Sequence, residues 1–290
     1  MTSRELVKAT LNFENRSGRV PRQIWTLPWA EENAGKMLKK IQTEFPDDIV
    51  TAPTILKKPT IACGDAYAVG ESTDDWGCKF TNIHRGVIGE VKEPLVEDED
   101  WDDWENIHIP VELLDFDVEQ VNAFCKNTDK FVIAGACPRP FEQLQFIRTT
   151  PEFYMDLVDP PANMLKFMEK MYAFYCELLE KWAKTDVDAL NFMDDWGSQN
   201  GLLINPMAWE KYFRPFYQEF IQIAYRNGKK TFMHSDGNTL DIYPRLIDLG
   251  LDAFNSQIFC MGLENLEQYK GKITFWGEID RQHLLPEGSK

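Results

Sequence analysis

The sequence is poor in positive charge. Its 290 residues include 31 Lys and Arg against 47 Asp and Glu, which gives a formal net charge of −16. Such a chain repels the polyphosphate backbone of nucleic acids and the surface of an anionic membrane. We therefore expect neither nucleic acid nor a membrane among its partners.

Paired cysteines and long apolar runs are also absent. The six cysteines are scattered and none belongs to a CxxC pair, which is typical of reduced thiols in a cytosolic protein. No run approaches the ~20 apolar residues of a membrane helix. The opening MTSRELVKATLNFENRSG is polar and lacks the apolar segment of an export signal. We predict a cytoplasmic protein.

Three common catalytic and nucleotide-binding motifs are missing. The chain has no GxSxG nucleophile elbow, no GxxxxGKS/T phosphate loop and no GxGxxG dinucleotide fingerprint. Cys137 could face a pocket, but without an identified histidine partner it is more typical of a small core residue. Nucleophilic hydrolysis and nucleotide binding are therefore poorly supported.

What the chain does contain is an alternation of short apolar runs with segments of helical period. This alternation is typical of βα units around a parallel sheet. The predicted strands are Val20–Thr26, Asp48–Ala52, Lys130–Ala134, Val187–Met193, Lys230–His234, Leu251–Asn255 and Lys272–Trp276. We predict an α/β protein, a single (β/α)₈ TIM barrel domain over residues 1–290 that is truncated before its eighth strand.

Two helices between these strands can be delimited from the sequence. One is long and amphipathic, from about Ala162 to Lys184. The other can be capped by Asn205, with Pro206 in its first turn, and ends at Gly228. Pro215 lies inside the second pattern, so we expect a kink or two abutting helices there.

The segment from Pro53 to Pro110 fits no βα unit, and we predict that it is a hairpin insertion after the second strand. Its alternating stretches KFTNI and GVIGEV flank His84-Arg85-Gly86. The acidic run EPLVEDEDWDDWE that follows is typical of a solvated face, and a docking surface for a basic partner is the alternative.

Polar side chains follow the last four predicted strands, at the end where the active sites of such barrels lie. They are Asp194, Asp195 and Gln199; His234 and Asp236; Asn255 and Gln257; and Glu278 and Asp280. Trp25, Trp29 and Trp196 could supply aromatic walls beside them. Acids, amides and a histidine that converge on one rim predict a pocket for an organic molecule.

The stretch TFMHSDGN has two interpretations. His234 and Asp236 are two residues apart on an extended strand end, so both side chains can point to one side and share a metal ion. Glu278 could add a third ligand. A hydrogen-bonded histidine followed by an Asp-Gly turn is the structural alternative.

Four stretches in order resemble the uroporphyrinogen decarboxylase superfamily. They read MDDWGSQNGLLINPMAWEKYFRPFYQEF, KTFMHSDGN, DLGLDAFN and KITFWGEID, and the opening RELVKATLNFENRSGRVP is also similar to that family's start. The resemblance covers nearly the whole chain. It implies a (β/α)₈ barrel with its pocket at the carboxyl ends of the strands.

Within the superfamily, DDWGC and DDWGSQ look more like the corrinoid-linked methyltransferases and demethylases. That branch holds zinc with a His-x-Cys motif and a later cysteine; His234 matches the histidine, and Asp236 stands where the first cysteine would be. True uroporphyrinogen decarboxylases work without metal or cofactor and bind substrate carboxylates with an arginine-rich N-terminal loop, which PRQIWTLPW lacks. Asp48 could match an aspartate of their substrate site.

Three functions stand as hypotheses. The leading one is a methyltransferase or demethylase that moves a methyl group between a small methylated substrate and a corrinoid on a partner protein. In it, zinc or another divalent metal, or a proton, is held at the substrate heteroatom by His234, Asp236 and Glu278, and Asp194 completes the catalytic set. The substrate-binding residues would be Asp195, Gln199, Asn255 and Asp280, with Trp25 and Trp196 excluding water.

There are two alternatives. One is a cofactor-free decarboxylase acting on uroporphyrinogen or a related ring, with Asp48 or Asp194 stabilising a protonated intermediate. The other is a non-catalytic ligand-binding barrel.

Overall fold

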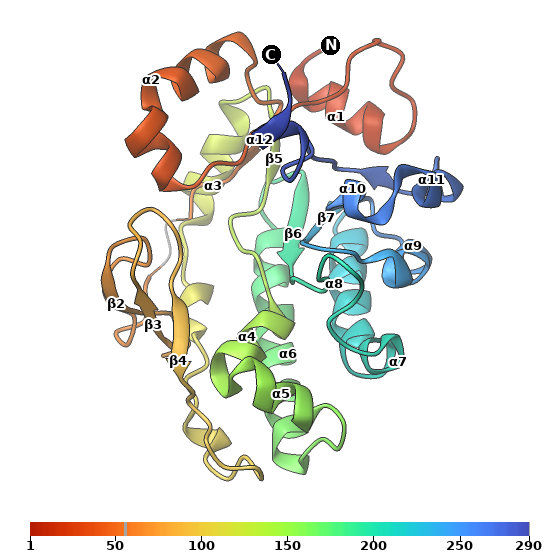
Figure 1. Ribbon diagram of the computed structural model, residues 1–290. Coiled ribbons are helices and arrows are strands. Elements are labelled where there is room, and N and C mark those ends of the chain that lie inside the picture. The colour runs from red at the N-terminus through yellow and green to blue at the C-terminus, as the bar shows by residue number, and fades with distance from the viewer. Residues whose placement is uncertain (55–56, 290) are drawn as a thin grey trace.

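The computed structural model describes residues 1–54 and 57–289. Its main element is a curled sheet of six parallel strands in the order β1-β5-β6-β7-β8-β9 (Figure 1). These strands are β1 (Ile49–Thr51), β5 (Phe131–Ile133), β6 (Ala189–Met193), β7 (Lys230–Ser235), β8 (Ala253–Ser256) and β9 (Thr274–Phe275). Within the described residues, β1 and β9 each have one neighbour in this sheet. The predicted α/β fold, a truncated barrel, is confirmed: in the part of the chain that the structure describes, the six strands form a curled sheet that does not close into a full barrel.

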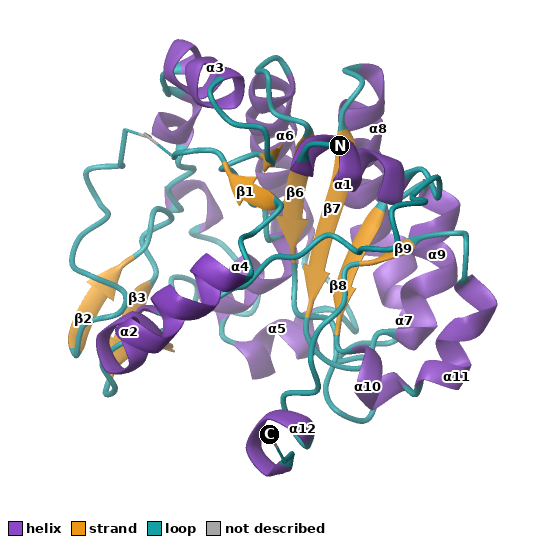
Figure 2. Ribbon diagram, turned by 90° about the horizontal axis from the view of Figure 1, so that it is seen from above, coloured by secondary structure: helices purple, strands orange, loops and turns teal. Residues whose placement is uncertain are grey.

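Helices cover the outer face of this sheet (Figure 2). The two largest contributors are α6 (Ala162–Ala183) and α8 (Arg214–Arg226), which pack against each other and against β6 and β7. Each buries one apolar side, which stabilises the fold by roughly 25 cal/mol per Å² of apolar surface removed from water. In the described part of the chain, no helix is both long and apolar enough to cross a membrane.

Apart from α2, which has 17 residues, the remaining helical elements are short. The α-helices are α1 (Ser3–Leu11), α2 (Pro28–Glu44), α3 (Val118–Lys126), α4 (Pro140–Arg148), α5 (Thr150–Asp156), α7 (Pro206–Ala208), α9 (Tyr243–Leu249), α10 (Ile258–Met261), α11 (Leu263–Leu266) and α12 (Leu284–Glu287). The 3₁₀ helices are η1 (Trp104–Asn106), η2 (Val111–Leu114), η4 (Leu240–Ile242) and η5 (Glu267–Tyr269). The element η3 (Trp209–Phe213) is a π-helix.

Both predicted helices are confirmed. The long helix is α6, and the second is divided into α7, η3 and α8. The side chain of Asn205 accepts a hydrogen bond from the backbone of Met207, so it caps α7 as expected. Pro215 lies in the first turn of α8, where its missing N–H costs no helical hydrogen bond.

The concave face of the sheet has an apolar layer followed by a polar one. Side chains alternate between the two faces of a strand, so Phe232 and His234 of β7 share this face. Phe232 belongs to an apolar cluster that α1 helps to close. Two residues later, the register places His234 beside Met193 and Asn255. The polar layer therefore lies at the carboxyl end of the sheet.

One predicted strand is wrong. Val20–Thr26 forms no strand and runs instead beside the start of β1, so the sheet has six strands and not seven. Carboxylate oxygens of Asp48 and Asp47 accept the backbone N–H groups of Arg22 and Ile24, each at 2.9 Å. The two carboxylates therefore accept hydrogen bonds from backbone N–H groups that would otherwise donate to the carbonyl groups of a neighbouring strand.

The hairpin insertion is confirmed, with one strand more than expected. β3 (Lys79–Asn82) pairs antiparallel with β4 (Glu90–Glu93) on one side and with β2 (Gly70–Thr73) on the other. The acidic run that follows is not only a solvated face, because its Trp101 is fully buried and donates from Nε1 to Asp156 at 2.9 Å.

Candidate functional site

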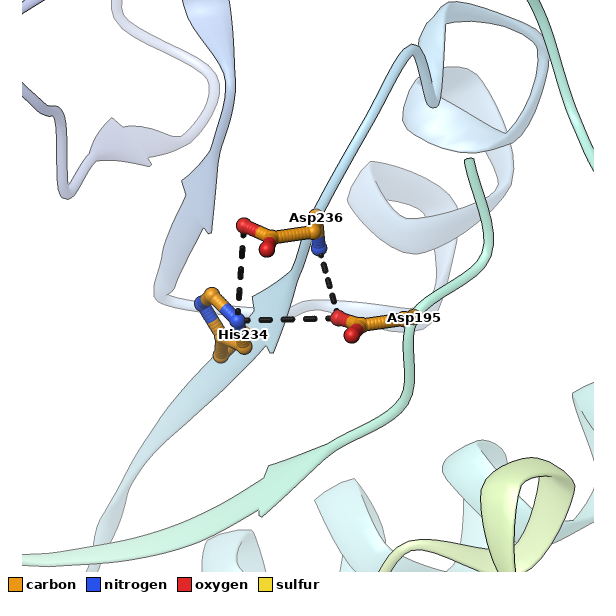
Figure 3. A group of neighbouring side chains, drawn as sticks. All are labelled: Asp195, His234 and Asp236. Atoms are coloured by element: carbon orange, nitrogen blue, oxygen red, sulfur yellow. Dashed lines mark hydrogen bonds and ion pairs between the residues drawn. The ribbon is translucent and has the colours of Figure 1, made fainter. Parts of the chain in front are cut away.

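Three polar side chains meet at the carboxyl ends of β6 and β7 (Figure 3). His234 is near the end of β7, Asp236 follows that strand, and Asp195 lies in the loop after β6. The Nε2 atom of His234 is 3.6 Å from Oδ1 of Asp195 and 3.8 Å from Oδ1 of Asp236. One ligand atom from each residue lies within 4.8 Å of the others. A single metal ion could bind all three, and we call this group the His234 cluster.

A close backbone contact holds the loops after β6 and β7 together. The N–H of Gly197 donates to the carbonyl of Asp236 at 3.1 Å, and the N–H of Asp236 donates to Oδ1 of Asp195 at 2.9 Å. A Cβ atom on Gly237, whose φ is +79°, would lie 2.0 Å from the carbonyl oxygen of Gly197. Glycine at 237 is therefore required both for its backbone conformation and for this approach.

Asn255 fixes the orientation of the His234 ring. Its Oδ1 lies 2.6 Å from Nδ1 of His234, while its Nδ2 donates to the carbonyl of Trp276 at 2.5 Å. Because the amide N–H₂ is used on that carbonyl, the amide oxygen faces the ring and Nδ1 carries the proton. The Nε2 atom then presents its lone pair to the two carboxylates. The half-exposed Trp25 packs edge-on against the same ring, with centroids 5.3 Å apart.

This arrangement favours a cation. Two carboxylate oxygens that face the Nε2 lone pair of His234 concentrate negative charge around one point, which attracts a metal ion. One nitrogen and two oxygen donors suit zinc or another divalent ion. The donor set therefore fits a metal site, with Asp195 in the place that the sequence analysis gave to Glu278.

Glu278 instead lies across a cavity of about 370 Å³ that Asp236 also lines. Arg281 bridges the two acids, with Nη2 2.8 Å from Oδ1 of Asp236 and Nε 3.3 Å from Oε2 of Glu278. Burial raises the pKa of Glu278, and Arg281 opposes that shift. Asp280 lines the same cavity. Its Oδ1 atom accepts hydrogen bonds from the backbone N–H groups of Gln282 and His283.

Gln199 also lies at this end of the sheet. It donates to Oε1 of Gln257 at 3.0 Å, and Gln257 lines the cavity. The structure thus brings together the predicted polar residues that follow β7, β8 and β9, and two of those that follow β6.

Two predicted site residues lie in the core instead. The carboxylate of Asp194 is fully buried and accepts hydrogen bonds from the backbone N–H of Glu142 and the hydroxyl of Tyr217. Burial raises the pKa of Asp194 well above its usual range. Trp196 is also fully buried and stacks on Phe141 with ring centroids 4.0 Å apart. Both side chains are occupied by packing and hydrogen bonding, and neither lines the cavity.

Asp48 lies at the opposite end of the sheet, immediately before β1. It accepts hydrogen bonds from Ser3 at 2.7 Å and from Arg19 at 2.7 and 2.8 Å. Burial alone would raise the pKa of Asp48, but these partners and the N–H of Arg22 lower it to about 2. Its position makes it a structural anchor of the N-terminal segment, apart from the His234 cluster.

The sequence model of the uroporphyrinogen decarboxylase (URO-D) family matches residues 73–290. The chain belongs to this family. Among solved structures, a methyltransferase from Methanosarcina mazei has the same fold, with a TM-score of 0.68 and 14% sequence identity over 99% of this chain and 86% of that chain. Among proteins of curated function, none shows significant sequence similarity. Membership of the URO-D family indicates an enzyme.

This URO-D family protein also has two charged side chains beyond the carboxyl end of β5 that the sequence analysis missed. Arg139 precedes α4 directly, and Glu142 lies in the first turn of that helix. Burial raises the pKa of Glu142 to about 7; Arg139 opposes the shift, and Asp195 and Asp236 add to it. The signal in the sequence was the pair of charges in RPFE, shortly after the apolar strand Lys130–Ala134.

Proposed function

We propose that this protein is a methyltransferase or demethylase that moves a methyl group from a small methylated substrate to a corrinoid carried on a partner protein. The observation that carries the proposal is the convergence of His234, Asp195 and Asp236 at the carboxyl end of the sheet. Membership of the URO-D family, and the fold shared with a methyltransferase, support it.

In this proposal the His234 cluster holds zinc or another divalent metal. Such an ion supplies Lewis-acid polarisation of the substrate heteroatom, which is worth several kcal/mol of charge stabilisation. Asn255 keeps the proton on Nδ1 of His234 and leaves Nε2 free as a ligand. Asp195 and Asp236 supply the negative charge that retains a cation, and Trp25 covers one edge of the imidazole and limits its contact with water.

The chemistry of this cluster narrows the substrate. Polarisation requires a lone pair on the methylated heteroatom, which methyl ethers, alcohols, thioethers and amines have and quaternary ammonium ions lack. Two carboxylate ligands make the site harder than a site with cysteines, which favours oxygen and nitrogen over sulfur. We therefore expect the methyl group to come from an ether, an alcohol or an amine.

The test compares the wild-type protein with His234→Ala, and uses His84→Ala on the exposed hairpin as a matched control. Each protein is dialysed and analysed for bound metal, then incubated with methanol, methoxyacetate or dimethylamine and a free reduced corrinoid, whose methylation changes its absorbance. We expect the wild type and His84→Ala to hold metal and transfer methyl groups, and His234→Ala to lose both. Equal transfer by His234→Ala would contradict the proposal, and rapid decarboxylation of uroporphyrinogen by the metal-free protein would support the alternative.

A further inference from the structure

Arg139 is a half-buried cation without a partner. Among the residues that the structure describes, none forms a hydrogen bond or an ion pair with its guanidinium group, although arginine has five N–H donors to satisfy. Burial is the largest influence and disfavours its charge, but Glu142, Cys137, Tyr175 and Asp194 together oppose burial, so the pKa of Arg139 is raised. The guanidinium group is therefore charged and free to bind a ligand.

Glu142 links Arg139 electrostatically to the His234 cluster. The charges of Arg139, Asp195 and Asp236 all act on its carboxyl group. One helical turn separates Glu142 from Arg139, yet no ion pair joins them, and one carboxylate oxygen of Glu142 is buried without a hydrogen-bond partner. Neither side chain of this pair is satisfied by the protein itself.

The loop that carries Arg139 lies over the concave face of the sheet. Cys137, two residues earlier, accepts a hydrogen bond from Nδ2 of Asn191 at 3.2 Å. Asn191 and Met193 of β6 share one face, and Met193 pairs with His234, so Asn191 lies on the face that carries the cluster. The Oδ1 atom of Asn191 is also buried without a partner. An unpaired cation on a loop over this face, with two buried unpaired acceptors on Glu142 and Asn191, is typical of a site for a polar ligand.

We propose that Arg139 binds a carboxylate group of the substrate, so that the substrate carries a carboxylate at one end and the methylated heteroatom at the other. A planar guanidinium group pairs with a carboxylate through two parallel N–H···O bonds, and partial burial strengthens the pair because water screens it less. A hydroxyl or ammonium group of the same substrate would satisfy the free acceptors of Glu142 and Asn191. The identity of the heteroatom rests on the proposed function, whereas the carboxylate subsite rests on Arg139 alone.

Arg281 is the competing cation at this end of the sheet. It is already paired with Asp236 and Glu278. An anion bound to Arg281 would have to displace both carboxylates or lie beside them, which costs more than binding to a guanidinium group that has no partner. Arg139 is therefore the better anion site.

Binding of methoxyacetate and of methoxyacetamide tests the proposal, because the two compounds have nearly the same shape and differ in charge. Their dissociation constants can be measured with the protein as purified, from the fluorescence of tryptophan, since Trp25 contacts the His234 ring. We expect the carboxylate to bind about tenfold more tightly than the amide, the effect of one or two charge-assisted hydrogen bonds. Arg139→Gln should abolish this preference, Arg139→Lys should keep part of it, and Arg16→Gln on the exposed surface should leave it unchanged.

Two results would overturn the proposal. One is equal binding of the two compounds to the wild type, or binding of neither. The other is a preference that disappears in Arg281→Gln but persists in Arg139→Gln, with circular dichroism showing that both variants are folded. A preference that depends on Arg139, in a protein that transfers no methyl group, would support the subsite and refute the proposed function, so the two failures can be told apart.

Discussion

Removal of the Asn255 side chain should weaken metal binding without removing any metal ligand. Asn255 makes one hydrogen bond of 2.6 Å to Nδ1 of His234 and is itself held by the carbonyl of Trp276. In Asn255→Ala the ring can adopt either tautomer and can rotate, so only part of the population presents the Nε2 lone pair to Asp195 and Asp236. Loss of such a supporting group lowers metal affinity by about 10- to 100-fold. That range corresponds to about 1.4–2.7 kcal/mol of binding free energy.

Isothermal titration calorimetry with zinc, in the presence of a competing chelator, measures this change. Asn265→Ala is the matched control, because Asn265 also donates its amide to a backbone carbonyl, that of Met261 at 2.9 Å, but lies outside the His234 cluster. We expect the zinc Kd to rise about 10- to 100-fold in Asn255→Ala and to stay constant in Asn265→Ala. An unchanged Kd in a folded Asn255→Ala variant would refute the assigned tautomer and the role of Asn255.

Two further predictions concern stability. Gly237→Ala should lower both the free energy of unfolding and the zinc affinity, because its Cβ would collide with the backbone of Gly197; Gly228→Ala, with a φ of +66° and open space around it, should lose only about 1 kcal/mol in urea unfolding. Equal losses in the two variants would contradict the close contact. Asp48→Asn should be less stable than the wild type above about pH 4, and the difference should shrink as the pH falls toward 2, because the folded-state pKa of Asp48 is about 2 and its ordinary value is 3.8. A difference that does not depend on pH would show that Arg19 does not stabilise the charged carboxylate.

The sequence was informative where a local pattern determines the structure. Short apolar runs predicted six of the strands in the main sheet, and the polar residues after them predicted His234, Asp236 and Asn255 at one end of it. Asp194 and Asp195 show the limit of that pattern. They are adjacent acids after the same apolar run, yet one is buried against Tyr217 and the other joins the His234 cluster. Tyr217 belongs to α8, so a contact between distant segments decides their roles.

Asp236 gives the site a connection that a cysteine at this position would not provide. Its Oδ1 atom lies 3.8 Å from Nε2 of His234 and 2.8 Å from Nη2 of Arg281, and Arg281 also reaches Glu278. A carboxylate oxygen can accept a charge-assisted hydrogen bond from arginine and still face the His234 cluster, whereas a thiolate is a weaker acceptor. The acid therefore ties the segment after β9 to the end of β7. Because Arg281 and a bound cation would share the same oxygen, occupation of the His234 cluster and the position of the segment that carries Arg281 should be coupled.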